Sequence, residues 1–109
     1  NKIIGDIVKS EKNVIYSYGA TAKGNTLINF LELDHGVISY CVDSTQIKYN
    51  KYLPGSNIKI VDEGFAKSNP PNYFLLTAWN YKDEIIKKVR EAGDLDSIFI
   101  VPFPSPHFA

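Results

Sequence analysis

A segment that contains two glycines, Tyr18-Gly19-Ala20-Thr21-Ala22-Lys23-Gly24-Asn25-Thr26, follows a short apolar run and precedes a pattern of helical period. Glycines at such a junction allow tight backbone turns and expose amide N–H groups at a helix N-terminus, where an anion can bind. Lys23 would place a positive charge near a phosphate, and Asn25 would donate hydrogen bonds. The segment is therefore either an anion-binding loop or a loop whose glycines serve only the packing of a strand against a helix.

Two common nucleotide-binding motifs do not fit this segment. Gly19 and Gly24 have the spacing of a P-loop, but Asn25 stands where the phosphate-binding lysine is required. The dinucleotide fingerprint fails because Ala22 is not glycine and Thr21, at the position of close approach, carries a branched side chain. These differences argue against a P-loop nucleoside triphosphatase and against standard NAD binding.

Asp43 and Trp79 are two further candidates for ligand contacts. Asp43 ends a predicted strand 24 residues after Gly19, where dinucleotide and SAM folds often carry a carboxylate that binds a ribose hydroxyl. Trp79 follows another predicted strand, and its indole could stack on a base or close a domain interface. Each residue also has a structural interpretation: Asp43 can open a turn, and Trp79 can be a half-buried core residue.

Short apolar runs and helical patterns alternate along the chain, which indicates an α/β fold with a parallel sheet. The clearest helix is predicted over Tyr81 to Ala92, with Asn80 as a cap and Gly93 as the closing residue. Right-handed crossovers predict a Rossmann-like, three-layer, doubly wound sheet of about five strands in the order 3-2-1-4-5, with Gly19 and Trp79 on one edge. The predicted strands are Val14 to Tyr18, Val37 to Val42, Ile58 to Val61, Tyr73 to Leu76 and Ile98 to Val101; Lys48 to Asn57 is a turn-rich crossover.

Composition narrows the classes of function. The 109 residues fit one domain, predicted over residues 1–109, and the 12 basic and 12 acidic residues give no net charge that would attract nucleic acid. No apolar stretch reaches the roughly 18 residues needed to span a bilayer, so we expect no membrane association. The single cysteine, Cys41, cannot form a disulfide framework or a cysteine zinc site, which favours a reducing, cytoplasmic location. His35 and His107 show no metal-ligand spacing, so no metal site is expected.

The start of the chain indicates a piece of a longer protein. The chain begins at Asn1 rather than Met and contains no Met. Ile3, Ile4, Ile7 and Val8 have the spacing of the last turns of an amphipathic helix.

Several short segments, in a fixed order over nearly the whole chain, resemble the C-terminal domain of the SAM-dependent sugar C-methyltransferase family. These are Tyr18-Gly19-Ala20 with Lys23-Gly24-Asn25-Thr26-Leu27; Asp43 with Lys48 and Lys51-Tyr52-Leu53-Pro54-Gly55; Ile58-x-Ile60; Asn72-Tyr73; Ala78-Trp79-Asn80 with Asp83-Glu84-Ile85; and Phe99-Ile100-Val101-Pro102.

The resemblance implies a division of labour between domains. In that family a zinc-binding N-terminal domain, a SAM-binding middle domain that carries the catalytic base, and a Rossmann-like C-terminal domain act together on a keto sugar linked to a nucleotide. By this resemblance we expect the chain to contact the other domains of a parent methyltransferase, to line part of a nucleotide-sugar cleft, and to hold neither SAM nor zinc itself. The expected cleft residues are Tyr18, Gly19, Lys23, Gly24, Asn25, Asp43 and Trp79, and none of them is expected to be catalytic.

Two other interpretations remain open from the sequence. The sheet edge could dock onto a neighbouring domain without contacting any ligand. The chain could also be a free-standing nucleotide- or SAM-binding Rossmann protein, which only Asp43 favours.

Overall fold

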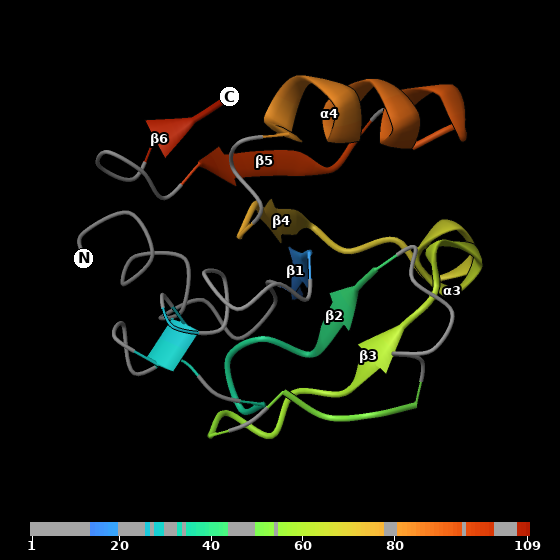
Figure 1. The fold of residues 1–109 in the computed structure, drawn as a ribbon. Coiled ribbons are helices and arrows are strands. Elements are labelled where there is room, and N and C mark those ends of the chain that lie inside the picture. Colours follow the sequence, from blue (N-terminus) through green and yellow to red (C-terminus); the bar gives the residue numbers. More distant parts are fainter. Residues whose placement is uncertain are drawn as a thin grey trace.

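The computed structural model describes residues 14–19, 26, 28–29, 33, 35–43, 50–53, 55–77, 81–94, 96–101 and 107–109. They form one sheet in the order β3-β2-β1-β4-β5-β6 (Figure 1). The first five strands are parallel, so the predicted order 3-2-1-4-5 is confirmed, and β6 is added antiparallel to β5. The elements are β1 (Ile15–Tyr18), β2 (Tyr40–Val42), β3 (Ile60–Val61), α3 (Glu63–Ser68), β4 (Tyr73–Leu75), α4 (Lys82–Glu91), β5 (Ile98–Val101) and β6 (His107–Phe108).

Both faces of the sheet are buried, because successive side chains of a strand point to opposite sides. Ile15 of β1 belongs to one core cluster, and its neighbour Tyr16 belongs to the other. The first cluster contains Ile15, Ile28, Leu33, Ile38, Cys41, Leu53, Ile58, Ile60, Leu75 and Ile100. The second contains Tyr16, Tyr18, Val42, Val61, Ala66, Phe74, Leu76, Ile85, Val89, Phe99 and Val101. The first face receives Ile28 from a helical segment, and the second is covered by α3 and α4, which gives the predicted three layers.

Helix α4 confirms the prediction from amphipathic spacing to within one residue at each end. Ile85 and Val89 are buried against the sheet, and Asp83 and Glu84 lie in the first turn, where the helix dipole favours negative charge. Gly93 has φ +106° and its amide bonds the carbonyl of Arg90 at 3.1 Å, as expected for a helix-closing glycine. Tyr81 occupies the N-cap position without a side-chain capping bond, and Asn80, the predicted cap, lies outside the described residues.

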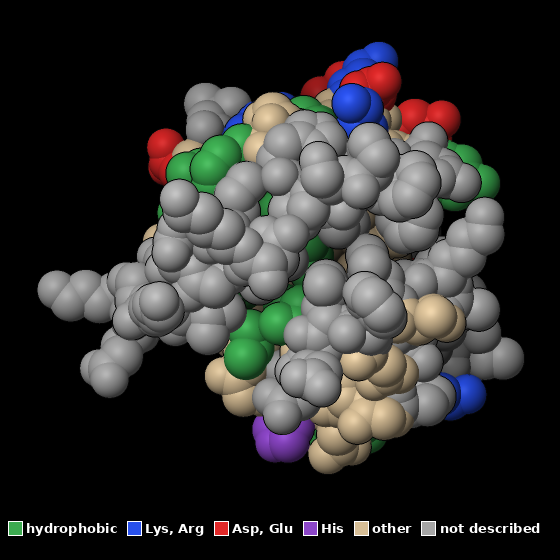
Figure 2. All heavy atoms as spheres, turned by 90° about the vertical axis from the view of Figure 1, so that its left-hand side faces the viewer, with side chains coloured by type: hydrophobic (Ala, Val, Ile, Leu, Met, Phe, Trp, Pro, Cys, Tyr) green, Lys and Arg blue, Asp and Glu red, His purple; other side chains and the backbone are tan. Residues whose placement is uncertain are grey.

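The outer face of α4 carries charges of both signs. In Figure 2 basic and acidic side chains lie side by side at the top of the molecule, where Figure 1 shows α4. Lys87 and Glu91 are 4.0 Å apart and both are well exposed. Such a pair contributes little to stability, so the buried face of α4 rather than its charges holds it on the sheet.

Helix α3 was not predicted from the sequence. It has only six residues, but it carries ordinary signals: Asp62 accepts a hydrogen bond from the amide of Phe65 at 2.7 Å, and Glu63 lies in the first turn. Its buried residue is Ala66. Pro70 follows soon after its end, where a proline cannot continue a helix. The capping pattern could have revealed α3, but its shortness hid it from a search for amphipathic periodicity.

The crossover between β2 and β3 is turn-rich, as predicted. Asn50, Gly55 and Asn57 have positive φ angles of 63°, 85° and 60°. The amide of Leu53 donates a hydrogen bond to the carbonyl of Ile58 at 2.8 Å. Ile58 therefore belongs to this turn, and β3 begins only at Ile60.

The loop that joins α4 to β5 is fixed by Arg90 and Asp94. Arg90 donates hydrogen bonds to the carbonyls of Asp94 at 2.9 Å and Ser97 at 2.8 Å, and its guanidinium lies 4.8 Å from the centre of the Phe99 ring. The Asp94 carboxylate accepts hydrogen bonds from the amides of Asp96 at 3.1 Å and Ser97 at 3.0 Å and lies 2.5 Å from the Ser97 hydroxyl. Burial alone would raise the pKa of Asp94, but these hydrogen bonds and the Arg90 charge outweigh it and lower the pKa.

We expect Asp94→Ala to lower the free energy of unfolding by about 1–3 kcal/mol at neutral pH, because it removes charge-assisted hydrogen bonds to two amides. A carboxylate whose pKa is depressed on folding contributes stability above its unfolded pKa of about 4, and this contribution is lost as the pH falls through the folded value. Urea unfolding at pH 7 and at successively lower pH measures both effects. The gap between wild type and variant should narrow in acid, and the exposed Asp96→Ala should cost less than about 0.5 kcal/mol; a gap that is independent of pH would contradict this account.

Candidate functional site

The carboxyl ends of β1, β2 and β4 meet at one edge of the sheet. Tyr18 is paired with Val42 and Ser17 with Leu75, so the residues that follow these strands lie at the same level. The amide of Gly19 bonds the carbonyl of Val42 at 2.8 Å, which extends the β1–β2 ladder one step beyond the strand. In open α/β sheets this edge, where the chain order reverses between β1 and β4, is where ligands bind.

The backbone conformation at position 19 favours glycine, which has no side chain. Its φ of +108° lies in the left-handed region, which L-residues with a Cβ rarely adopt. Because its amide already bonds Val42, it is not free to bind an anion, and any anion contact of the predicted loop falls on later residues. Gly19 thus sets the direction in which the chain leaves β1.

Asp43 lies beside Gly19 in the same row of the sheet. Its amide bonds the carbonyl of Val61 at 3.1 Å, and the residue is only 7% exposed. The sequence placed a carboxylate at the end of β2, and the structure brings it to the same edge as Gly19. A carboxylate at this edge can accept a hydrogen bond from a ligand hydroxyl.

Thr77 joins β4 to β1 at this edge and was missed from the sequence. It is 1% exposed, and its hydroxyl oxygen lies 2.7 Å from the carbonyl oxygen of Gly19 and 3.0 Å from that of Tyr18. The hydroxyl donates to these carbonyls, so it fixes the β1 end against the β4 end. A single polar residue directly after the apolar run Tyr73–Leu76 was the available signal.

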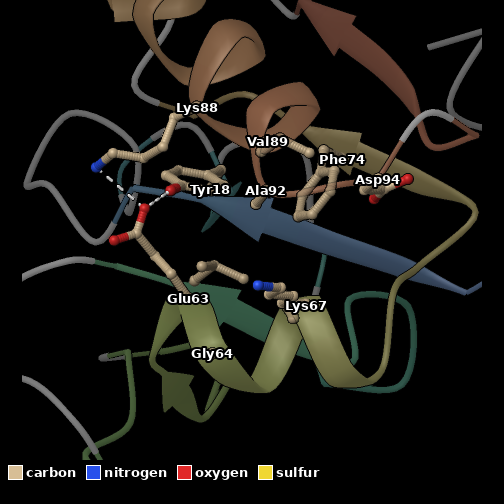
Figure 3. A pocket seen from close by; sticks show the side chains of 11 residues that line it. Tyr18, Glu63, Gly64, Lys67, Phe74, Lys88, Val89, Ala92 and Asp94 are labelled. Atoms are coloured by element: carbon tan, nitrogen blue, oxygen red, sulfur yellow. Dashed lines mark hydrogen bonds and ion pairs between the residues drawn. The ribbon is translucent and has the colours of Figure 1, made fainter.

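Tyr18 directs its side chain toward the helices of the second core face. Its hydroxyl donates a hydrogen bond to the carboxylate of Glu63, and the same carboxylate lies 3.0 Å from the amine of Lys88 (Figure 3). These three residues connect β1, α3 and α4. At the carboxyl edge Tyr18 therefore contributes its backbone carbonyl, which accepts a hydrogen bond from Thr77, whereas its ring points toward the helices.

The remaining predicted cleft residues, Lys23, Gly24, Asn25 and Trp79, lie outside the described residues, so their roles stay predictions. Within the described part of the chain, no three His, Cys, Asp or Glu residues are grouped so as to hold a metal ion. The helices in that part are also too short or too polar to cross a membrane.

Comparison with known proteins identifies the family. Residues 2–104 match the family described as the C-methyltransferase C-terminal domain. The chain belongs to this family. It is also 40% identical over 99 residues to the C-methyltransferase NovU of Streptomyces niveus, an alignment that covers 91% of this chain and 24% of that relative. The chain thus spans about a quarter of the length of that enzyme, and the resemblance found in the ordered sequence segments is confirmed.

We expect Thr77→Val to lower the free energy of unfolding by about 1–3 kcal/mol, because it removes the buried hydroxyl that donates to the carbonyls of Tyr18 and Gly19. Thr77→Ser keeps the hydroxyl and loses one methyl group, which should cost about 0.8 kcal/mol. Urea unfolding of the two variants measures the difference. If the valine variant is as stable as the serine variant, the hydroxyl does not hold β1 to β4.

Proposed function

We propose that this domain forms one wall of the nucleotide-sugar cleft of a SAM-dependent C-methyltransferase. The observation that carries the proposal is the meeting of Gly19, Asp43 and Thr77 at the carboxyl edge of β1, β2 and β4. This is the ligand edge of doubly wound sheets, and the family membership supplies the class of enzyme. The name of the 40% identical relative, a C-methyltransferase, supports the same reaction type.

Each polar part of a nucleotide sugar has a candidate partner at this edge. Asp43 would accept a hydrogen bond from a ribose or sugar hydroxyl. Lys23 would neutralise diphosphate charge, and Asn25 with the neighbouring amides would donate hydrogen bonds to it. Trp79 would stack on the base or pack against the adjacent domain.

The methyl transfer itself is assigned to other parts of the full-length protein. SAM supplies the methyl group, and the glycine fingerprint that a donor site of this fold would need is interrupted here by Thr21. We therefore assign SAM, zinc and the catalytic base to the other domains, and substrate positioning to this one.

The variant Gly19→Ala tests whether the carboxyl edge of the sheet contacts the nucleotide sugar. We expect it to raise the KM for the nucleotide sugar by about five- to tenfold in the full-length enzyme, equivalent to roughly 1–1.4 kcal/mol of binding, because the chain must leave β1 in another direction. Gly93→Ala is the matched control: its φ of +106° matches the +108° of Gly19, and a Cβ there meets no atom within 4 Å. Both variants should lose similar stability, about 1–3 kcal/mol, but only Gly19→Ala should change KM.

Steady-state kinetics at a temperature where both variants are folded separates binding from stability. Equal KM values for the two glycine variants and wild type would contradict the cleft assignment and favour an edge that only docks onto a neighbouring domain. A rise in KM for both variants would show that KM follows stability, which also contradicts it.

A calorimetric titration with SAM tests the division of labour. We expect no measurable heat of binding with the 109-residue chain and micromolar binding with the full-length protein, because Thr21 interrupts the glycine fingerprint that a donor site of this fold would need. Micromolar binding of SAM to the chain alone would assign the donor site to this domain instead.

A further inference from the structure

An apolar surface lies on the first face of the sheet, where β4, β5 and β6 run side by side (Figure 1). It consists of Tyr73, Ile98 and Phe108, and we call it the β4–β6 patch. Tyr73 is paired with Ile98, and Phe108 is paired with Ile100 of the first core cluster. The ring centres of Tyr73 and Phe108 are 6.4 Å apart. Because paired residues of neighbouring strands point to the same side of a sheet, the three side chains form one surface.

The β4–β6 patch continues the core but is open to solvent. Ile98 is 43% exposed and Phe108 is 51% exposed, whereas Leu75 and Ile100, two residues further along the same face of β4 and β5, are each 1% exposed. Helices α3 and α4 do not cover the patch, because both pack on the second face of the sheet. Large apolar side chains that gather on one open surface are typical of a site that receives another segment.

The chain enters the sheet beside this patch. The amide of Val14 donates a hydrogen bond to the side-chain oxygen of Asn72 at 2.8 Å, and the amide of Asn72 donates to the carbonyl of Val14 at 2.9 Å. Asn72 directly precedes Tyr73, and its carbonyl accepts a hydrogen bond from the amide of Ile98 at 2.9 Å. The polypeptide that precedes Val14 is therefore held next to two of the three patch residues.

The sequence just upstream of Val14 has an apolar face that suits the patch. Residues 1–13 lie outside the described part of the chain, so this step rests on their spacing. On a helix of 3.6 residues per turn, four aliphatic residues fall within about 140° of one another and Lys9 falls on the opposite side. These are Ile3, Ile4, Ile7 and Val8. Residues 9–13 can span up to roughly 17 Å, which exceeds the roughly 10 Å across three neighbouring strands.

We propose that the β4–β6 patch is the docking site of residues 3–8, with their apolar face on Tyr73, Ile98 and Phe108. The occupant is this segment rather than a second copy of the chain, because the hydrogen bonds of Asn72 tether it beside the patch and a short tether gives an effective concentration in the millimolar range. Docking fixes the direction from which the preceding polypeptide reaches the domain. The inference concerns the first face of the sheet and the proposed function concerns its carboxyl edge, so each can fail without the other.

Hydrogen–deuterium exchange of the full-length protein tests this docking site. Ile98→Asp should speed exchange in peptides that cover residues 2–12 by about tenfold or more, because it places a charge in the apolar contact. Tyr52→Asp is the matched control: Tyr52 is 55% exposed and is paired with Lys59 near β3, at the other edge of the sheet. It should leave exchange of residues 2–12 unchanged. Slow exchange in α4 shows that each variant remains folded.

A second pair of variants leaves the sheet untouched, so the proposal stays testable if Ile98→Asp unfolds the domain. Ile7→Ala should speed exchange of residues 2–12, because it removes apolar contact, whereas Lys9→Ala on the opposite side should not.

The proposal is overturned if residues 2–12 of the wild type exchange as fast as an unstructured peptide, or if the two members of either matched pair have equal effects. It is also overturned if Ile98→Asp speeds exchange only in peptides outside residues 1–109, because a neighbouring domain would then cover the patch. Dilution of the wild type that reproduces the effect of Ile98→Asp would assign the patch to a second copy of the chain and would overturn it too.

Discussion

The pairing of β1 with β2 on one side and β4 on the other is the constraint on which the rest of this domain depends. Central β1 is only four residues long, and each of its side chains is buried in one face or the other. Because both neighbours run parallel to it, the chain must leave its carboxyl end in one direction toward β2 and arrive at β4 from the other. The positive φ of Gly19 and the hydroxyl of Thr77 fix that point, and the candidate site is built around it.

The same constraint separates two kinds of surface. The carboxyl edge combines polar backbone with the side chains of Asp43 and Thr77, which can form hydrogen bonds. The face of the sheet under α3 and α4 is apolar because its strands present residues such as Tyr18, Val42 and Phe74 to the helices. Tyr18 takes part in both: its carbonyl bonds Thr77 at the edge, and its hydroxyl bonds Glu63 beneath the helices.

The sheet order and α4 could be predicted from the sequence because they follow from long-range periodicity. Apolar strands and right-handed crossovers leave few arrangements, and ten residues of α4 repeat a clear amphipathic pattern. Helix α3 and strand β6 could not be found in this way, since six and two residues carry almost no period. In the site, Gly19 and Asp43 could be placed at one edge from topology alone. The contact between Thr77 and the carbonyls of β1, and that between Tyr18 and Glu63, depend on residues 45 to 59 positions apart whose meeting only the packed structure reveals.

Hydrogen–deuterium exchange of the full-length protein, with and without the proposed nucleotide-sugar substrate, tests most directly whether the carboxyl edge of β1, β2 and β4 is the substrate wall. If this edge is the substrate wall, substrate addition should slow exchange in peptides that cover residues 18–26, 42–50 and 76–82. Peptides that cover residues 66–74 and 92–98, at the opposite edge, should be unchanged. Protection confined to those opposite-edge peptides, or none in this domain at saturating substrate, would contradict the account.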